Sequence, residues 1–332
     1  MAFKNVGITK LDTMSGASKP FAMDAAGIAS GQAFLTSELE KRDMLVRTPL
    51  TSFTYSRDIP IRVGGGWAEF VSAMNVGYGL TGGSGDGMVA SGSADGIPMV
   101  QADFGKDLWK THAIYAGTRV FWIDMQKGNM TGRNIDQLLR DGLRMAYDKH
   151  MDENVYAGFA KYGTTGLMNN ADVTITSATG NFSALTPDQI LADINNAILT
   201  AWAAAGYDLD AVPNHILLPY QQYNYIATTK VSTIAEKTIL TFLLENNVAK
   251  NYGVDLFIGA TAWCAGAGAG GTDRMVTYCN KERFIAVDEL VPLTRAMTTP
   301  NAERFSYDTA YAGNVSETEV FYPETILYTD GI

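Results

Sequence analysis

A glycine-rich tract stands between two long segments that resemble β-strands. Six glycines fall between Thr81 and Gly96, and glycine weakens helix and strand interiors because it loses the most backbone freedom on folding. The flanking segments, 67–80 and 97–125, have the composition of strands. We predict an extended β-hairpin or loop over about residues 62–122, with the glycines at its tip. An isolated two-stranded ribbon is only marginally stable in water, so contacts with residues outside the ribbon must stabilise it.

The segments before the hairpin cannot form a core of their own. Residues 1–45 scatter glycines among small and polar residues without a sustained period, so we predict an extended arm. Residues 45–61 are rich in β-branched and aromatic residues, which indicates one or two short strands.

The longest helical pattern in the chain is expected over residues 131–162. Its apolar stripe includes Ile135, Leu139 and Ala146, with Asn129 or Thr131 able to cap its start and Gly163 able to end it. Such a helix is a rod of about 45 Å. Asp152 and Glu153 are expected on its solvated or interface face.

A compact α/β unit is predicted over about residues 184–292. Thr186 to Gln189 form a capping box with proline at the first helical position. Asn214 to Leu218 indicate a buried strand, and a further helix around 239–248 ends at Gly253. Strands are expected at 173–176, 254–258, 274–278 and 284–287. The tail, 291–332, is again strand-like.

The residue types that carry chemistry form no recognisable motif, so we expect no catalytic, cofactor-binding or metal site. The histidines, His112, His150 and His215, are too far apart in sequence to pair as ligands. His215 is expected to be a structural histidine of a core strand. Cys264 and Cys279 are expected to be buried thiols. The glycine runs 82–87 and 266–271 lack the Lys-Ser/Thr of a phosphate loop.

Composition excludes several classes of protein. Hydrophobic residues make up 46% of the 332 residues and charged residues 18%, which excludes a disordered chain. The net charge of −10 and the lack of basic runs disfavour direct gripping of nucleic acid. The apolar runs are shorter than the ~20 residues of a membrane span, and the N-terminus lacks the apolar region of a secretory signal. We expect a soluble protein that folds inside a cell.

The order of the parts, together with the segment DGMVASGSADGIPMVQADFGKD (86–107), resembles the major capsid proteins of tailed bacteriophages. That resemblance implies an α+β fold of the Hong Kong 97 type. Residues 1–45 are then the N-terminal arm, and 46–183 a peripheral domain with the extended β loop (about 62–122) and the spine helix (about 131–162). Residues 184–292 are the α/β axial domain, and 293–332 return to the peripheral domain.

The same resemblance implies a structural protein without enzymatic activity. It predicts an icosahedral head, built from pentamers and hexamers of this chain, around double-stranded DNA that is not bound sequence-specifically. No charged helical segment precedes the hairpin, so a separate scaffolding protein, or none, is implied, with a portal and decoration proteins as further partners and no membrane. Assembly is expected in the host bacterial cytoplasm, and the final location is the virion shell.

Two alternatives remain open on sequence grounds. An encapsulin-type nanocompartment shell has the same fold but encloses cargo, and a soluble α/β enzyme would remain a single chain of 35.9 kDa. Particles of megadalton mass would exclude the enzyme. Within the coat-protein interpretation, the loop from Cys264 to Gly271 is expected near a capsomer axis, so that Gly268→Trp leaves the subunit folded but impairs capsomers.

Overall fold

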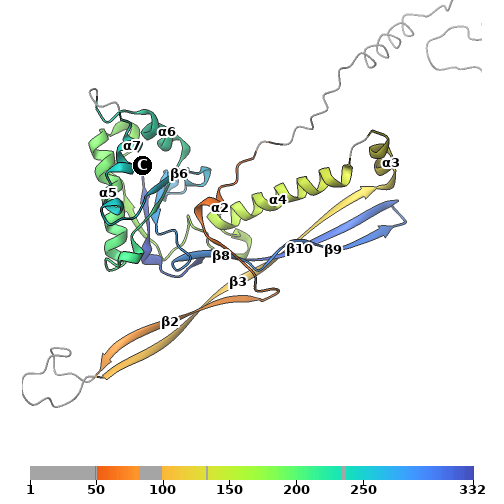
Figure 1. The fold of residues 1–332 in the computed structure, drawn as a ribbon, viewed down its shortest axis with the longest axis horizontal. Coiled ribbons are helices and arrows are strands. Elements are labelled where there is room, and N and C mark those ends of the chain that lie inside the picture. The colour runs from red at the N-terminus through yellow and green to blue at the C-terminus, as the bar shows by residue number, and fades with distance from the viewer. Residues whose placement is uncertain (1–48, 50, 82–98, 132–133, 233–236) are drawn as a thin grey trace, which may run out of the picture. The chain divides into compact units, whose positions relative to one another are not determined.

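The computed structural model describes residues 49, 51–81, 99–131, 134–232 and 237–332 (Figure 1). The chain divides into two units, residues 1–51 and 52–332, and the architecture below is that of the second. The predicted arm and the glycine tip of the predicted hairpin lie outside the described residues. The described part mixes helices and strands, which agrees with the expected α+β class.

A mixed five-stranded sheet forms the centre of this unit. Its order is β4 (Thr174–Ser177), β12 (Ile326–Asp330), β7 (Arg274–Tyr278), β5 (His215–Leu218) and β6 (Phe257–Ala260). β12 lies parallel to β4 and antiparallel to β7, while β5 lies parallel to β6. Every residue of β5, β7 and β12 is buried, so this sheet is covered on both faces.

The two faces of the sheet belong to two different cores, because successive side chains of a strand point to opposite faces. Ile216, Met275 and Leu327 pack with four helices, which are α5 (Pro187–Ala204), α6 (Tyr220–Thr228), α7 (Ile239–Glu245) and α8 (Val248–Asn251). Leu217, Val276 and Tyr328 pack instead with the C-terminal part of the long helix α4 (Ile135–Ala157). The sheet therefore joins the helical layer to the long helix.

The predicted 131–162 helix is wrong at both ends. α4 begins after Asn134, whose side chain accepts a hydrogen bond from the Gln137 amide, and ends at Gly158 with a φ of 73°. A Cβ at Gly158 would lie 2.5 Å from the Thr164 carbonyl oxygen, so only glycine fits this turn. A separate helix, α3 (Trp122–Thr131), precedes α4 where the sequence looked strand-like.

A four-stranded antiparallel sheet contains the predicted hairpin. Its order is β2 (Phe70–Thr81), β3 (Met99–Phe121), β10 (Ser306–Ser316) and β9 (Val291–Asn301). β3 pairs with β2 over its first half and with β10 over its second. As a result, β2 and the first half of β3 form a two-stranded ribbon that extends beyond the rest of the sheet (Figure 1). The hairpin prediction is confirmed over these strands.

A small third sheet lies at the base of the ribbon. Its order is β1 (Ile61–Val63), β8 (Ile285–Glu289) and β11 (Glu319–Val320). The prediction of strands alone over 45–61 is wrong, because Tyr55–Asp58 form the short helix α2. The Thr54 and Tyr55 amides at its start donate to the Asp152 carboxylate on α4, so a contact 97 residues away stabilises the turn.

Within the α/β part most predicted elements are confirmed. The capping box at Thr186 forms as expected, and strands lie at or within three residues of the predicted positions. The predicted 239–253 helix is two helices, α7 and α8, because Asn247 caps a new start. Short 3-10 helices cover Ala160–Tyr162, Phe182–Ala184, Leu209–Ala211, Ala262–Cys264, Ala269–Gly271 and Pro323–Thr325.

The C-terminal strand joins the five-stranded sheet. The resemblance implies that residues 293–332 return to the peripheral domain, and β12, near the end of this segment, lies between β4 and β7. Alternate residues of β12 belong to two different hydrophobic cores. Leu327 joins the core beneath α5, while Ile326 and Tyr328 join the core that includes α4.

Candidate assembly surface

The ribbon formed by β2 and the first half of β3 has one strongly apolar face. Directly paired residues of antiparallel strands lie on the same face, and the pairing places Met74 opposite Lys106 and Val76 opposite Phe104. The large apolar side chains of this face are between 41% and 79% exposed. These side chains, which form the apolar ribbon face, are Phe70, Met74, Val76, Tyr78, Leu80, Val100, Phe104 and Leu108.

The opposite face of the same ribbon is mostly small and polar, apart from the exposed Met99 at its far end. It carries Asn75, Gly77 and Gly79 on β2, and Asp103 and Asp107 on β3. Near the base it is covered, because Trp109 packs edge-on against Phe321 with ring centroids 5.0 Å apart. Within residues 67–76, neither alternating set of side chains is purely apolar. Only the register of the two strands shows that the apolar residues share one face.

The base of the ribbon is held by backbone contacts to the rest of the unit. The Thr111 amide donates to the Glu69 carbonyl over 3.2 Å, and the Asn314 side chain donates to the Gly66 and Ala68 carbonyls. Gly64, Gly65 and Gly66 all have positive φ, a conformation that side-chain-bearing residues rarely adopt. The ribbon is therefore fixed at its base while its apolar face has no cover within the described residues.

The predicted structural role of His215 is confirmed. Its Nε2 lies 3.3 Å from the Asp58 carboxylate, which also accepts two hydrogen bonds from Arg57 and one from the Tyr156 hydroxyl. Burial by itself raises the pKa of Asp58, but the hydrogen bonds from His215, Arg57 and Tyr156 hold that pKa below its usual value. Asp58 is fully buried, so this group joins α2 to the five-stranded sheet and no substrate can reach it.

Asp152 is not on a solvated face, which corrects the sequence-based expectation. Its side chain is buried and accepts hydrogen bonds from the amides of Thr54 and Tyr55 and from the Trp263 indole. Glu153, the adjacent residue, is exposed as expected. The helical pattern could not distinguish the two, because the partners of Asp152 come from distant parts of the chain.

Two of the histidines that are distant in sequence lie near each other. The His112 ring stacks on Tyr162 with centroids 5.0 Å apart, and the His150 ring stacks on Phe159 at 4.7 Å. Burial lowers the pKa of His112, against the raising effect of the Glu317 charge. Together with Lys161 they line a cleft between β3 and α4. No cluster of three metal-ligating side chains occurs in the described ranges.

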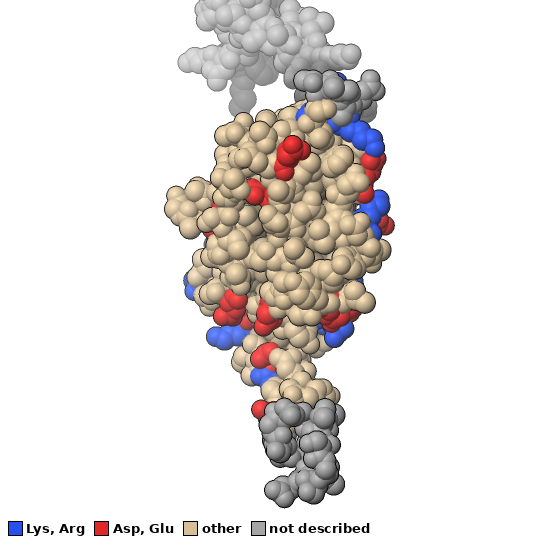
Figure 2. Space-filling view, turned by 90° about the vertical axis from the view of Figure 1, so that its left-hand side faces the viewer, with Lys and Arg blue, Asp and Glu red and all other residues tan. Residues whose placement is uncertain are grey.

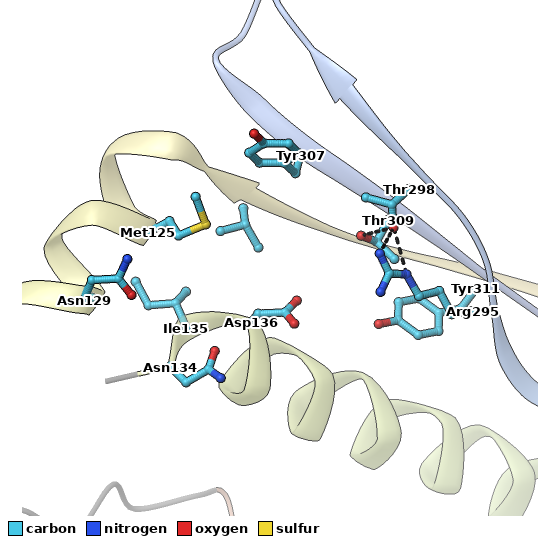
Figure 3. Close-up of a pocket in the computed structure, with 12 residues that line it drawn as sticks. Met125, Asn129, Asn134, Ile135, Asp136, Arg295, Thr298, Tyr307, Thr309 and Tyr311 are labelled. Carbon is cyan, nitrogen blue, oxygen red and sulfur yellow. Dashed lines mark hydrogen bonds between the residues drawn. The ribbon is translucent and has the colours of Figure 1, made fainter. Parts of the chain in front are cut away.

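A second cleft, of about 630 Å³, lies between the helices α3 and α4 and the strands β9 and β10 (Figure 3). Tyr307 and Tyr311 point into it from β10, and Arg295 enters from β9 with its guanidinium donating to the Thr298 hydroxyl. Its acid, Asp136, is paired with Arg140 on the same helix. The lining therefore offers no set of groups arranged for catalysis.

The cysteine prediction is confirmed, whereas the expectation that Gly268→Trp leaves the subunit folded is wrong. Cys264 and Cys279 are free and buried. A Cβ at Gly268 would lie 2.6 Å from the Thr272 hydroxyl and 2.9 Å from the Asp330 carboxyl carbon. Gly268→Trp would therefore disrupt the subunit itself. The glycine run 82–87 lies outside the described residues.

Charged side chains are sparse on the side of the unit that carries α5. Figure 2 shows Lys, Arg, Asp and Glu mainly toward the edges of this view. The sequence agrees, since no charged residue falls between Asp193 and Asp208, although Leu199 and Tyr207 are exposed there. No basic field suited to gripping nucleic acid appears on this side. In the described part of the chain, no helix is long and apolar enough for a membrane span.

Comparisons with known proteins agree with this arrangement. A family model described as "Major capsid protein" matches residues 85–332. The capsid protein of Myoviridae phage XM1 has the same fold with a TM-score of 0.76, at 18% identity, over 89% of this chain and 98% of that one. The capsid of a native GTA particle gives a TM-score of 0.62 at 11% identity, over 93% and 99% of the two chains.

A virus-like particle from Pyrococcus furiosus also has this fold, with a TM-score of 0.51 at 12% identity over 83% of this chain and 91% of that one. No curated protein sequence matches the chain. The family model favours the coat-protein interpretation over a nanocompartment shell, and its members are structural rather than enzymatic proteins. The chain belongs to the major capsid protein family and is a phage coat protein that assembles with copies of itself into the virion shell.

Proposed function

We propose that the chain builds an icosahedral head of pentamers and hexamers around double-stranded DNA, with a fold of the Hong Kong 97 type. In this proposal residues 1–45 are the arm, 46–183 the peripheral domain and 184–292 the axial domain. Residues 293–332 return to the peripheral domain. The acidic net charge of −10 supports packaging without sequence-specific binding, because it limits adhesion of DNA to the wall.

The single observation that carries this proposal is the apolar ribbon face. With about 60% of each side chain exposed, its eight residues present on the order of 900 Å² of apolar surface, comparable with the ~800 Å² that each partner buries in a stable interface. Monomeric proteins seldom leave such a patch uncovered. We infer that it packs across the peripheral domain of a neighbouring copy.

The glycines at the ribbon base support the proposal that the apolar ribbon face makes contacts in both pentamers and hexamers. Pentamers and hexamers require the same residues to meet neighbours at slightly different angles. Gly64, Gly65 and Gly66, with φ values of 128°, 114° and 68°, can absorb such differences because glycine occupies these conformations without steric cost. A separate scaffolding protein, a portal and decoration proteins are further proposed partners, and the host cytoplasm is the proposed place of assembly.

The test compares two acidic substitutions on opposite faces of the same ribbon. Phe104→Asp places a carboxylate on the apolar ribbon face, and Gln101→Asp places one on the polar face. Sedimentation velocity and negative-stain microscopy should show particles for the wild type and for Gln101→Asp. Phe104→Asp should remain unassembled with unchanged thermal unfolding of the free subunit. Equal assembly of the two variants would contradict the proposed docking of the ribbon.

A further inference from the structure

A carboxyl group lies buried at the base of the ribbon with one of its oxygens unpaired. Glu319, on β11, is fully buried. Its Oε2 accepts a hydrogen bond from the Arg62 guanidinium, whereas its Oε1 is buried without a hydrogen-bond partner among the described residues. An unpaired buried oxygen costs free energy, and it costs more when it carries charge. The site therefore favours the neutral form of Glu319.

The charges around Glu319 have the same effect. The carboxylates of Glu319 and Asp288 share one guanidinium, that of Arg62 on β1, whose Nε donates to Asp288 of β8 over 2.6 Å. From β10, Ser316 contributes a hydroxyl, while Glu317 accepts a backbone amide of β3. Burial, with a contribution from the Asp288 charge, raises the pKa of Glu319 to about 7 against the effects of Ser316 and Arg62. When Glu319 is protonated, Arg62 and Asp288 remain as a balanced pair.

The Arg62 side chain connects Glu319 to both strands of the ribbon. Its guanidinium lies over the Phe321 ring, 5.5 Å from the ring centroid, and the Phe321 ring packs edge-on against Trp109 of β3 at 5.0 Å. Along the chain, Arg62 is the middle residue of β1, which leads through residues 64–66 into β2. A change in the position of Arg62 therefore reaches β2 through the backbone and β3 through the two ring contacts.

The connection between β1 and β2 is suited to act as a hinge. β1 is an edge strand of three residues, paired with β8 alone within the described residues. Residues 64–66, which follow it, are glycines with positive φ, and the Gly64 amide donates to the Glu289 carbonyl of β8 over 3.1 Å. The hydrogen bonds of Arg62 tie this short strand to both β8 and β11. The ribbon base is thus held by few contacts, of which Glu319 accepts one.

We infer that Glu319 is a pH-sensitive switch that controls how firmly the ribbon is held. When Glu319 carries its proton, Arg62 remains on Asp288 and β1 holds the ribbon base in place. When Glu319 ionises, the charge on its unpaired oxygen needs water, which enters as the β1–β8–β11 sheet loosens, and the ribbon becomes mobile about residues 64–66. This inference rests on the proposed docking of the ribbon and names its regulation. Docking weakens as the pH rises through neutrality, because a mobile ribbon loses more conformational entropy when it docks.

The first experiment measures the mobility of the ribbon base in the free subunit. Hydrogen exchange of the Gly64, Gly66 and Thr111 amides is recorded at pH 6 and pH 8 and divided by the intrinsic rate at each pH, which gives protection factors. A carboxyl whose pKa is about 7 when enclosed and 4.5 when open lowers protection about tenfold over this interval. Glu319→Gln should show no such loss, because glutamine cannot ionise.

Two further variants separate titration from packing. Glu317→Gln is the matched control: it removes a neighbouring acid, which accepts the Lys110 amide, and should retain the wild-type loss of protection. Asp288→Asn leaves Arg62 to Glu319 alone and removes a charge that raises the pKa of Glu319, so the loss should occur at lower pH. A purely structural role for Glu319 would not shift the pH at which protection falls.

The second experiment measures assembly. The subunit concentration for half-maximal particle formation should rise about three- to tenfold more between pH 6 and pH 8 in the wild type than in Glu319→Gln. Unchanged protection of the wild type between these pH values, or an equal loss in Glu319→Gln, would overturn the switch. Equal pH dependence of assembly in the two proteins would overturn its control of docking. If the wild type forms no particles at either pH, the proposed self-assembly fails, and hydrogen exchange of the free subunit still decides whether the ribbon base responds to the proton.

Discussion

The five-stranded sheet and the β2–β3 ribbon both contain many apolar, strand-forming residues. The two regions differ in whether the subunit itself buries these side chains. In β5, β7 and β12 every side chain is buried by helices of the same subunit. In the ribbon, eight large apolar side chains share the apolar ribbon face, and all of them are exposed within the described residues. The first pattern makes a subunit that folds alone, whereas the second leaves a surface that only another molecule can complete.

The comparison also explains where the polar groups lie. Around the five-stranded sheet, buried charges are paired, as with Arg274, which donates two hydrogen bonds to Asp330 and one to the Met168 carbonyl. On the ribbon, Lys106 and Lys110 remain among exposed apolar residues. Substitutions should therefore affect subunit stability in the first region and assembly in the second.

The largest loss of subunit stability is expected for Asp58→Ala. The change leaves His215, Arg57 and the Tyr156 hydroxyl without their shared partner in a buried site, at a cost of about 3–5 kcal/mol. Urea unfolding of the free subunit measures this loss. Asp103→Ala, which removes an exposed acid from the ribbon, serves as control and should leave unfolding unchanged. Similar losses of unfolding free energy in both variants would show that the five-stranded sheet and the ribbon do not differ in this respect.

A smaller, pH-dependent effect is expected for Glu319→Gln in the sheet at the ribbon base. Burial, with a contribution from the Asp288 charge, raises the pKa of Glu319 to about 7 despite hydrogen bonds from Ser316 and Arg62. The folded protein thus holds this proton more tightly than the unfolded chain, whose carboxyl has a pKa of 4.5. The resulting stability is present below pH 4.5 and is lost as the pH rises to about 7.

Glutamine cannot ionise and so avoids this loss. The stability of Glu319→Gln relative to wild type should therefore increase by about 1–3 kcal/mol between pH 5 and pH 8. Thermal unfolding of both proteins across this range measures the difference. A constant difference at all pH values would show that Glu319 does not titrate in this range and that the ribbon base is less tightly enclosed than its burial indicates.

The smallest effect on the subunit is expected from shortening the ribbon tip. Replacing residues 82–95 with a short turn removes no described core residue, so the free subunit should unfold within about 0.5 kcal/mol of wild type. Shell formation should be lost or strongly weakened, because part of the surface between copies is removed. Failure of the shortened protein to fold, or normal particles from it, would place the tip outside the interface assigned to the ribbon.

Several local features were predictable because they depend on neighbouring residues. Thr186 and Gln189 cap α5 as expected, and His215 to Leu218 are buried between two prolines. The end of the long helix was not predictable, since Gly158 and Gly163 are equally good stop signals in sequence. The packing of residues 164–166 against the helix end selects Gly158.

The candidate site was predictable only in outline. Glycines flanked by strand-like segments indicated a hairpin that needs outside support, but the apolar ribbon face depends on the pairing of Val76 with Phe104 and of Leu80 with Val100. A one-residue shift in that register would have divided the same side chains between two faces. Sequence alternation within one strand carries no information about this choice.

The capped start of α5, the two strands of the hairpin and the order of parts that resembles capsid proteins could be read from the sequence, because they depend on local propensity and composition. Which strands become neighbours depends instead on long-range contacts. The tertiary structure placed β12 between β4 and β7, buried Asp152 beneath Trp263 and exposed Phe305 in a left-handed turn. Each of these outcomes depends on contacts between residues far apart in the chain, whose free energies no local pattern records.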